Sequence, residues 1–78
     1  MLKHAIPYKD RPTLHINIRR YPPSTEHSYY RTAAISTLLR AGYADAAKEL
    51  RSEAGRYTFD GLRELLKNNY VHLHIYSK

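Results

Sequence analysis

A single glycine separates two apolar stripes that have helical spacing, and this feature constrains the fold more than any other. The stripe before Gly42 lies on one side of a helix and consists of Ala34, Ile35, Leu38 and Leu39. The stripe after it consists of Tyr43, Ala46, Ala47, Leu50 and Ala54. Because glycine readily takes the left-handed conformation that ends a helix, the segment 32–54 is predicted to fold as a helical hairpin. The alanines let the two helices approach closely, which gives a fold nucleus but no chemistry.

Two segments outside the hairpin alternate between apolar and polar residues, as half-buried strands do. The first covers residues 13–21, and its apolar face carries Leu14, Ile16 and Ile18. The second covers residues 71–78, and its apolar face carries Val71, Leu73 and Ile75. Pro22 and Pro23 end the first strand, because proline donates no hydrogen bond to a strand ladder.

Three helices are expected between these strands. The first runs from about residue 25 to 41 behind an N-cap at Ser24 or Thr25, and the second runs from residue 43 or 44 to 54. Gly55 is expected to close the second helix as Gly42 closes the first. Thr58 caps a third helix that ends at residues 68–69, with a buried stripe of Phe59, Leu62, Leu65 and Leu66.

These elements predict an α+β fold of order β-α-α-α-β, with the helical hairpin packed on one face of a small sheet. The sheet has two strands, or three if the N-terminal arm adds a short one, and the pattern leaves the strand polarity open. A chain of 78 residues has room for a single core. We therefore assign residues 1–12 to an N-terminal arm and residues 13–78 to one domain.

The composition favours a soluble protein of the cytoplasm. The chain has no cysteine, so neither disulfides nor thiolate metal sites are available to it. No apolar run approaches the roughly 20 residues of a membrane span, and the N-terminus lacks the apolar segment of a signal peptide. We therefore expect no membrane partner.

The charge is basic and unevenly spread. The net charge is +6, and residues 1–31 hold six basic and two acidic residues. Arginine beside tyrosine suits a nucleic-acid backbone with stacked bases, and it suits a protein interface equally well. The candidate contact residues are Lys9, Arg11, Arg19, Arg20, Tyr21, Tyr29, Tyr30 and Arg31. In a plainer interpretation, Tyr29 or Tyr30 belongs to the core and the arginines keep the protein soluble.

Histidines gather on the polar faces of the two predicted strands. His72 and His74 project from one face, and His15 joins them if the strands pair. With Tyr76, these residues form a candidate dimer or metal face, and histidines two apart on a strand can chelate zinc, copper or nickel. No cysteine or nearby carboxylate completes a ligand set, so we favour a homodimer contact and expect neither a metal nor another cofactor.

The sequence shows no catalytic motif. Asp45, Glu49 and Glu53 recur every four residues on the second helix and are interpreted as a solvated face. No serine has a nucleophile context, and no glycine-rich loop could cradle a phosphate. We expect a non-enzymatic binding or regulatory protein without a small-molecule substrate, similar in size and style to phage or plasmid accessory proteins. Its expected partner is nucleic acid or a nucleic-acid-handling protein; the alternatives are a self-associating or inhibitory module with an acidic partner and, third, metal binding through the strand histidines.

Residues 33–53 also resemble the LisH motif, a helical hairpin that mediates dimerisation in many eukaryotic proteins. The matching residues are Leu38, Leu39, Gly42, Tyr43, Ala46, Ala47, Leu50 and Glu53. A tight helical hairpin with a glycine turn selects the same residues, so we attribute the resemblance to packing and assign no family.

Overall fold

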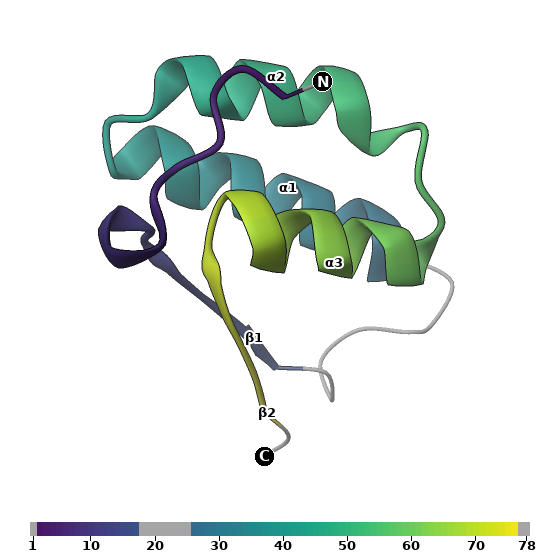
Figure 1. Cartoon of the computed structure of the whole chain (residues 1–78). Helices are drawn as coiled ribbons and strands as arrows, with labels where there is room; N and C mark the ends of the chain where they lie inside the picture. Colours follow the sequence, from purple (N-terminus) through teal and green to yellow (C-terminus); the bar gives the residue numbers. More distant parts are fainter. Residues whose placement is uncertain (1, 18–25, 77–78) are drawn as a thin grey trace.

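The computed structural model describes residues 2–17 and 26–76, and it confirms the predicted α+β order (Figure 1). A short 3-10 helix precedes the first strand. In chain order the elements are η1 (Tyr8–Asp10), β1 (Thr13–Asn17), α1 (Glu26–Arg40), α2 (Ala44–Ala54), α3 (Phe59–Asn69) and β2 (His72–Tyr76). All three helices lie on one side of the sheet. α1 packs on β1 and α3 packs on β2, while α2 packs on α1 in the layer farthest from the strands.

The two strands are parallel, which settles the polarity that the sequence left open. Leu14 pairs with Leu73 and Ile16 pairs with Ile75, so the apolar residues of both strands share the face that meets the helices. The three helices run back and forth (Figure 1), and an odd number of them returns the chain to the end of the sheet where β1 began. In the described part of the chain the sheet has these two strands alone.

The hairpin turn is built as predicted. Gly42 has a φ of 90°, in the left-handed region, and its N–H donates to the carbonyl of Leu39 over 3.1 Å. The N–H of Tyr43 donates to the carbonyl of Leu38 over 2.9 Å, which completes a Schellman motif. Gly55 follows the last residue of α2 as predicted, but it does not share the conformation of Gly42, because its φ is −66°, in the right-handed region.

Thr58 caps α3 as predicted. Its hydroxyl oxygen accepts a hydrogen bond from the N–H of Gly61 over 3.2 Å. The N-cap predicted for α1 at Ser24 or Thr25 lies outside the described residues, as do Ile18 and the two prolines that follow the first strand.

The core lies between the sheet and the helices and contains most of the predicted stripes. Leu38, Leu50, Leu62 and Leu66 are fully buried. Leu39 was predicted to be buried and is not, because half of it is exposed on the outer side of α1. Tyr43 and Phe59 are only partly buried. Three core residues that the helical patterns did not indicate are Ile6, Tyr30 and Tyr70.

The N-terminal arm caps the end of α3. The N–H of Ile6 donates to the carbonyl of Asn69 over 2.7 Å. The Arg11 guanidinium donates to the carbonyls of Lys67 and Asn68 over 3.0 and 2.9 Å, and its Nε donates to the carbonyl of Ile6. The last carbonyls of a helix have no partner within the helix and carry its negative dipole end, so a cation with several donors is well suited to them.

Candidate binding surface on the outer face of the sheet

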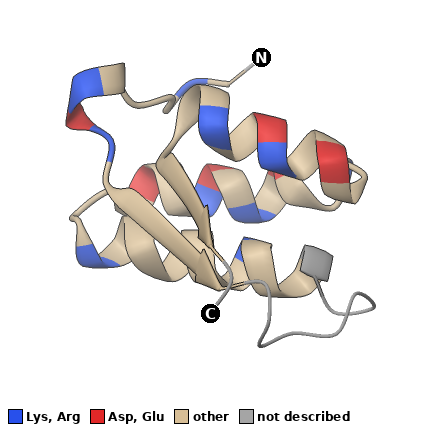
Figure 2. Ribbon diagram, turned by 90° about the horizontal axis from the view of Figure 1, so that it is seen from below, with Lys and Arg blue, Asp and Glu red and all other residues tan. Residues whose placement is uncertain are grey.

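The face of the sheet that points away from the helices carries the polar residues of both strands. In register order the pairs are Thr13 with His72, His15 with His74, and Asn17 with Tyr76. His15 and His74 are exposed, and His72 and Tyr76 are half-buried. The two strands contain no Lys, Arg, Asp or Glu, and Figure 2 shows them as an uncharged strip in front of helices that carry both signs of charge.

Five rings lie along this face in two groups of contacting rings, and together we call them the ring platform. His15 and His74 stand opposite each other across the strands, with ring centroids 5.4 Å apart. His74 is 5.7 Å from Tyr76 on the same strand. At the other end, the ring of Tyr8 meets His72 edge-on at 4.6 Å. The sequence indicated the three histidines and Tyr76, but Tyr8 comes from the arm and follows no strand period.

Positive charge lies at the Tyr8 end of the ring platform. The guanidinium carbon of Arg11 lies over the Tyr8 ring at 5.5 Å from its centroid, within reach of a cation–π interaction. A groove of about 440 Å³ opens beside them, between η1, the end of α3 and the start of β2. Arg11 and Lys67 both line this groove. Lys9 is exposed in η1.

The other predicted contact residues lie elsewhere. Tyr30 is 2% exposed and packs edge-on against Phe59 at 5.0 Å, so the plainer interpretation applies to it. Tyr29 and Arg31 are half-buried on α1. Arg19, Arg20 and Tyr21 lie outside the described residues.

The described residues do not gather a metal-ligand set. Among residues 2–17 and 26–76, no three His, Asp or Glu side chains stand together as a group that could hold a metal ion. In the same residues, no helix is both long and apolar enough to cross a membrane.

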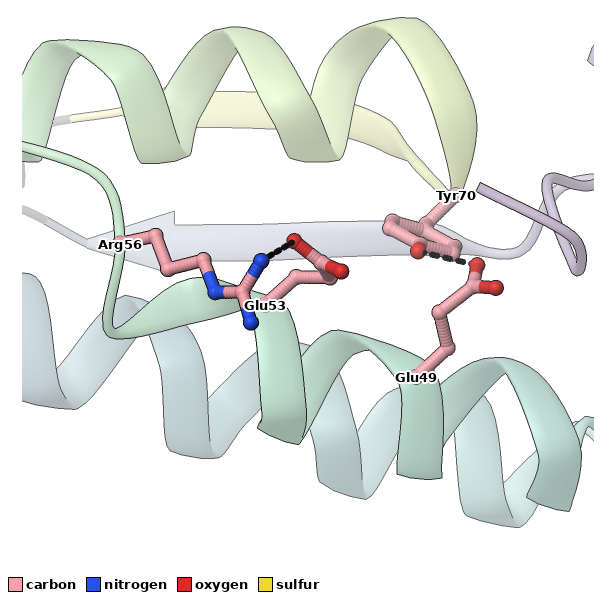
Figure 3. Close-up of polar contacts among 4 residues, drawn as sticks. All are labelled: Glu49, Glu53, Arg56 and Tyr70. Atoms are coloured by element: carbon pink, nitrogen blue, oxygen red, sulfur yellow. Dashed lines mark hydrogen bonds and ion pairs between the residues drawn. The ribbon is translucent and has the colours of Figure 1, made fainter. Parts of the chain in front are cut away.

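Glu49 is half-buried and its carboxylate binds other segments of the chain, which the interpretation of α2's acidic residues as a solvated face did not include. Its carboxylate accepts a 2.6 Å hydrogen bond from the hydroxyl of Tyr70, shown in Figure 3. It also accepts from the backbone N–H groups of Lys3 over 2.6 Å and of His4 over 3.1 Å. The neighbouring Glu53 is 3.9 Å from Arg56, an ordinary surface ion pair.

These contacts shift the pKa of both partners. Burial alone would raise the pKa of the Glu49 carboxyl, but the hydrogen bonds from Tyr70, Lys3 and His4 and the charge of His4 outweigh burial and hold it below the usual 4.5. Burial raises the pKa of the Tyr70 phenol well above its usual range, and the hydrogen bond to the Glu49 carboxylate raises it further. Both shifts keep Glu49 charged and Tyr70 neutral at pH 7. We therefore interpret this cluster as a structural contact that connects α2 to the end of α3 and to the N-terminal arm.

The chain was compared with protein family models, with curated proteins and with solved structures, and none of them matches it.

Proposed function

We propose that this protein is a small non-enzymatic binding protein that contacts single-stranded nucleic acid through the ring platform. The observation that carries the proposal is the set of five rings along an uncharged outer sheet face, with Tyr8 against His72 and His74 against both His15 and Tyr76. Flat rings on an open surface stack with unpaired bases, and such stacking is worth about 1–3 kcal/mol per base and tolerates any sequence.

The distribution of charge supports the same proposal. The chain has a net charge of +6, which attracts a phosphate backbone at long range. Lys9 and Arg11 lie beside the Tyr8 end of the ring platform, so that charge flanks the rings without interrupting them. Phosphates following the edge of the platform would meet these cations while the bases lie on the rings.

Recognition of a duplex by a helix is less well supported. α2 is the second helix of the hairpin, and it carries Asp45, Glu49 and Glu53 beside its basic residues. Phosphates would repel these carboxylates at the surface of a duplex groove. The bases of a duplex are also stacked on one another, so the ring platform would gain little from them.

The proposal is tested by fluorescence anisotropy with a labelled 12-nucleotide oligomer, as single-stranded DNA, as single-stranded RNA and as a duplex, at low ionic strength. We expect single strands to bind more tightly than the duplex, with an affinity that falls log-linearly as salt rises. Failure to bind any single strand, or a preference for the duplex, would overturn the proposal.

Matched variants distinguish the contribution of the ring platform to binding from that of the overall net charge. His74→Ala, which removes an exposed ring, should weaken single-strand binding several-fold. Lys9→Gln should also weaken it and make the salt dependence shallower, whereas Lys48→Gln should have little effect, because α2 lies on the side of the molecule away from the sheet (Figure 1). If the two lysine variants lost the same amount of single-strand affinity, this would indicate attraction by net charge alone. Arg19→Ser with Arg20→Ser tests the remaining basic cluster in the same assay.

A further inference from the structure

The free edge of β2 presents a definite set of backbone groups. The N–H of His72 donates to the carbonyl of Pro12 over 2.9 Å, so the N–H and C=O of His72 point toward β1. Backbone groups alternate along a strand, and those of His74 and Tyr76 therefore also point toward β1. The N–H and C=O groups of Leu73 and Ile75 point the other way. Within the described residues, β1 is the single strand neighbour of β2, so these groups face an open edge.

This edge is also apolar and unprotected. Leu14 is 3% and Ile16 0% exposed on β1, but their register partners Leu73 and Ile75 on β2 are only partly buried. Open edges are normally guarded by lysine, proline or a bulge, and β2, with the sequence HLHIY, contains no charged residue and no proline. A two-stranded sheet is marginal by itself, and further strands or packing are needed to stabilise it. The sheet is therefore unfinished on the β2 side.

We propose that a second copy of this chain completes the sheet by pairing its β2 antiparallel to this one, about a two-fold axis at His74. In this register His74 stands opposite His74 of the second copy, and Leu73 stands opposite Ile75. Leu73 and Ile75 are the residues whose backbone groups point outward, so each Leu73–Ile75 pair exchanges two hydrogen bonds. The result is a four-stranded sheet of order β1-β2-β2-β1.

The side chains fit this symmetric pairing. Residues directly opposite each other in an antiparallel pair lie on the same face. Leu73 therefore meets Ile75 on the helix-covered face, and His72 meets Tyr76 on the outer face. The pattern HLHIY is polar, apolar, polar, apolar, polar, which reads the same from either end. Each copy carries a net charge of +6, and pairing through an uncharged strand brings no like charges of the two strands together.

The free edge of β1 is a weaker candidate. Its apolar residues Leu14 and Ile16 are already buried and would gain little from another strand. A groove of about 410 Å³ separates the start of β1 from α1, and it is lined by polar residues that include Thr13, His15 and Arg40. Pairing there would bring charged and polar groups of two copies together. The exposed apolar surface thus favours β2.

The dimer would lengthen the ring platform. Across the four strands, His15 and His74 of one copy would continue into His74 and His15 of the other, at the strand spacing of about 4.8 Å. The two platforms would merge into one face. The association rests on the β2 edge alone and does not depend on the proposed nucleic-acid contact, so each can fail without the other.

Cysteine cross-linking tests the axis, because the natural chain has no cysteine. His74→Cys would place two Cα atoms about 4.5 Å apart in a pair without backbone hydrogen bonds, a distance that a disulfide can span. His15→Cys is the matched control, since His15 is also exposed and faces the same side of the sheet. Under mild oxidation, His74→Cys should form a covalent dimer and His15→Cys should form no covalent cross-link. Cross-linking of His15→Cys instead, of both equally or of neither would overturn the proposal.

Sedimentation and light scattering of the unmodified chain provide a second, independent test. Without nucleic acid, the mass should rise from 9.1 kDa toward twice that value as concentration increases. Ile75→Pro removes an outward N–H and leaves the ladder with β1 intact, so it should hold the protein monomeric with its helical circular dichroism preserved. His15→Pro removes an outward N–H from the β1 edge and should leave the dimer in place. A monomer at all concentrations of the unmodified chain would overturn the proposal.

Discussion

The hydroxyl of Tyr70 donates to the carboxylate of Glu49 over 2.6 Å, and this contact joins the end of α3 to the middle of α2. The ring of Tyr70 is fully buried, and its hydroxyl reaches the carboxylate at the core boundary (Figure 3). The same carboxylate holds the arm through the N–H groups of Lys3 and His4. One side chain on α2 therefore fixes two segments that are distant in the sequence, and its removal should loosen both.

Glu49→Gln should destabilise the fold by about 1 kcal/mol at pH 7, because a charged acceptor is replaced by a weaker neutral one. The pKa of Glu49 is lowered in the folded state, so its stabilising effect is present above the unfolded value of 4.5 and is lost as pH falls through the folded value. Urea unfolding at pH 7 and pH 3 should show a gap between wild type and variant that closes in acid. Glu64→Gln, at a side chain 63% exposed, should show no such gap at either pH.

Tyr70→Phe should cost about 1 kcal/mol at neutral pH, since it removes one hydrogen bond and leaves Glu49 with its two backbone donors. The pKa of the folded phenol is raised, so its contribution is present below the unfolded value of 10.0 and is lost as pH rises above it. Stability measured between pH 7 and 11 should therefore fall less in the variant than in wild type. Tyr8→Phe is the control because Tyr8 is 72% exposed, and the same change there should leave the alkaline slope as it is.

Gly42→Ala should destabilise the protein by about 1–2 kcal/mol, because an L side chain is disfavoured at a φ of 90°. Gly55→Ala is a matched comparison, since neither new Cβ would meet another atom within 4 Å. Gly55 has a φ of −66°, so alanine there should be neutral or stabilising by up to about 1 kcal/mol. Equal losses in thermal unfolding would contradict the backbone argument.

Leu50→Ala should cost about 2–5 kcal/mol, because Leu50 is 0% exposed in the core. In a chain this small, that loss should leave much of the population unfolded at room temperature. Leu39→Ala removes the same atoms from a residue that is 50% exposed and should change stability by less than about 0.5 kcal/mol. Denaturant midpoints of the two variants measure the contrast directly.

Arg11→Lys should cost about 1–2 kcal/mol despite keeping the charge, because a lysine cannot reach two helix carbonyls in a planar fork. Lys9→Gln, in the exposed η1, should leave stability unchanged. If Arg11→Lys were as stable as wild type, the hydrogen bonds of the Arg11 guanidinium would contribute nothing to the cap on α3.

The helices could be predicted because their signals are local. Helix caps and helical spacing depend only on residues a few positions apart, as at Gly42, Thr58 and the spaced leucines. The bounds of α2 and α3 followed from these signals. The strands could be placed for the same reason, through the alternation around Ile16 and Leu73.

The rest depends on contacts between distant segments, which no local period encodes. Arg11 looks like a surface cation in the sequence, and its role as a cap appears only when the arm meets the end of α3. Glu49 has the spacing of a solvated helix face, yet the hydroxyl of Tyr70, 21 residues later in the sequence, donates a hydrogen bond to its carboxylate. Tyr8 joins the ring platform through a contact with His72 that the sequence pattern could not indicate.

The parallel register has a consequence for the order in which the chain can fold. It joins residues 13–17 to residues 72–76, so residues 18–71 form the loop that strand pairing must close. Contacts at such separation form slowly, because the chain loses the entropy of loop closure before the hydrogen bonds between the strands can stabilise the pairing. The hairpin around Gly42 needs only neighbouring residues and should form first. During synthesis, β1 therefore has no strand partner until residues 72–76 have left the ribosome, and we expect the sheet to form after the hairpin.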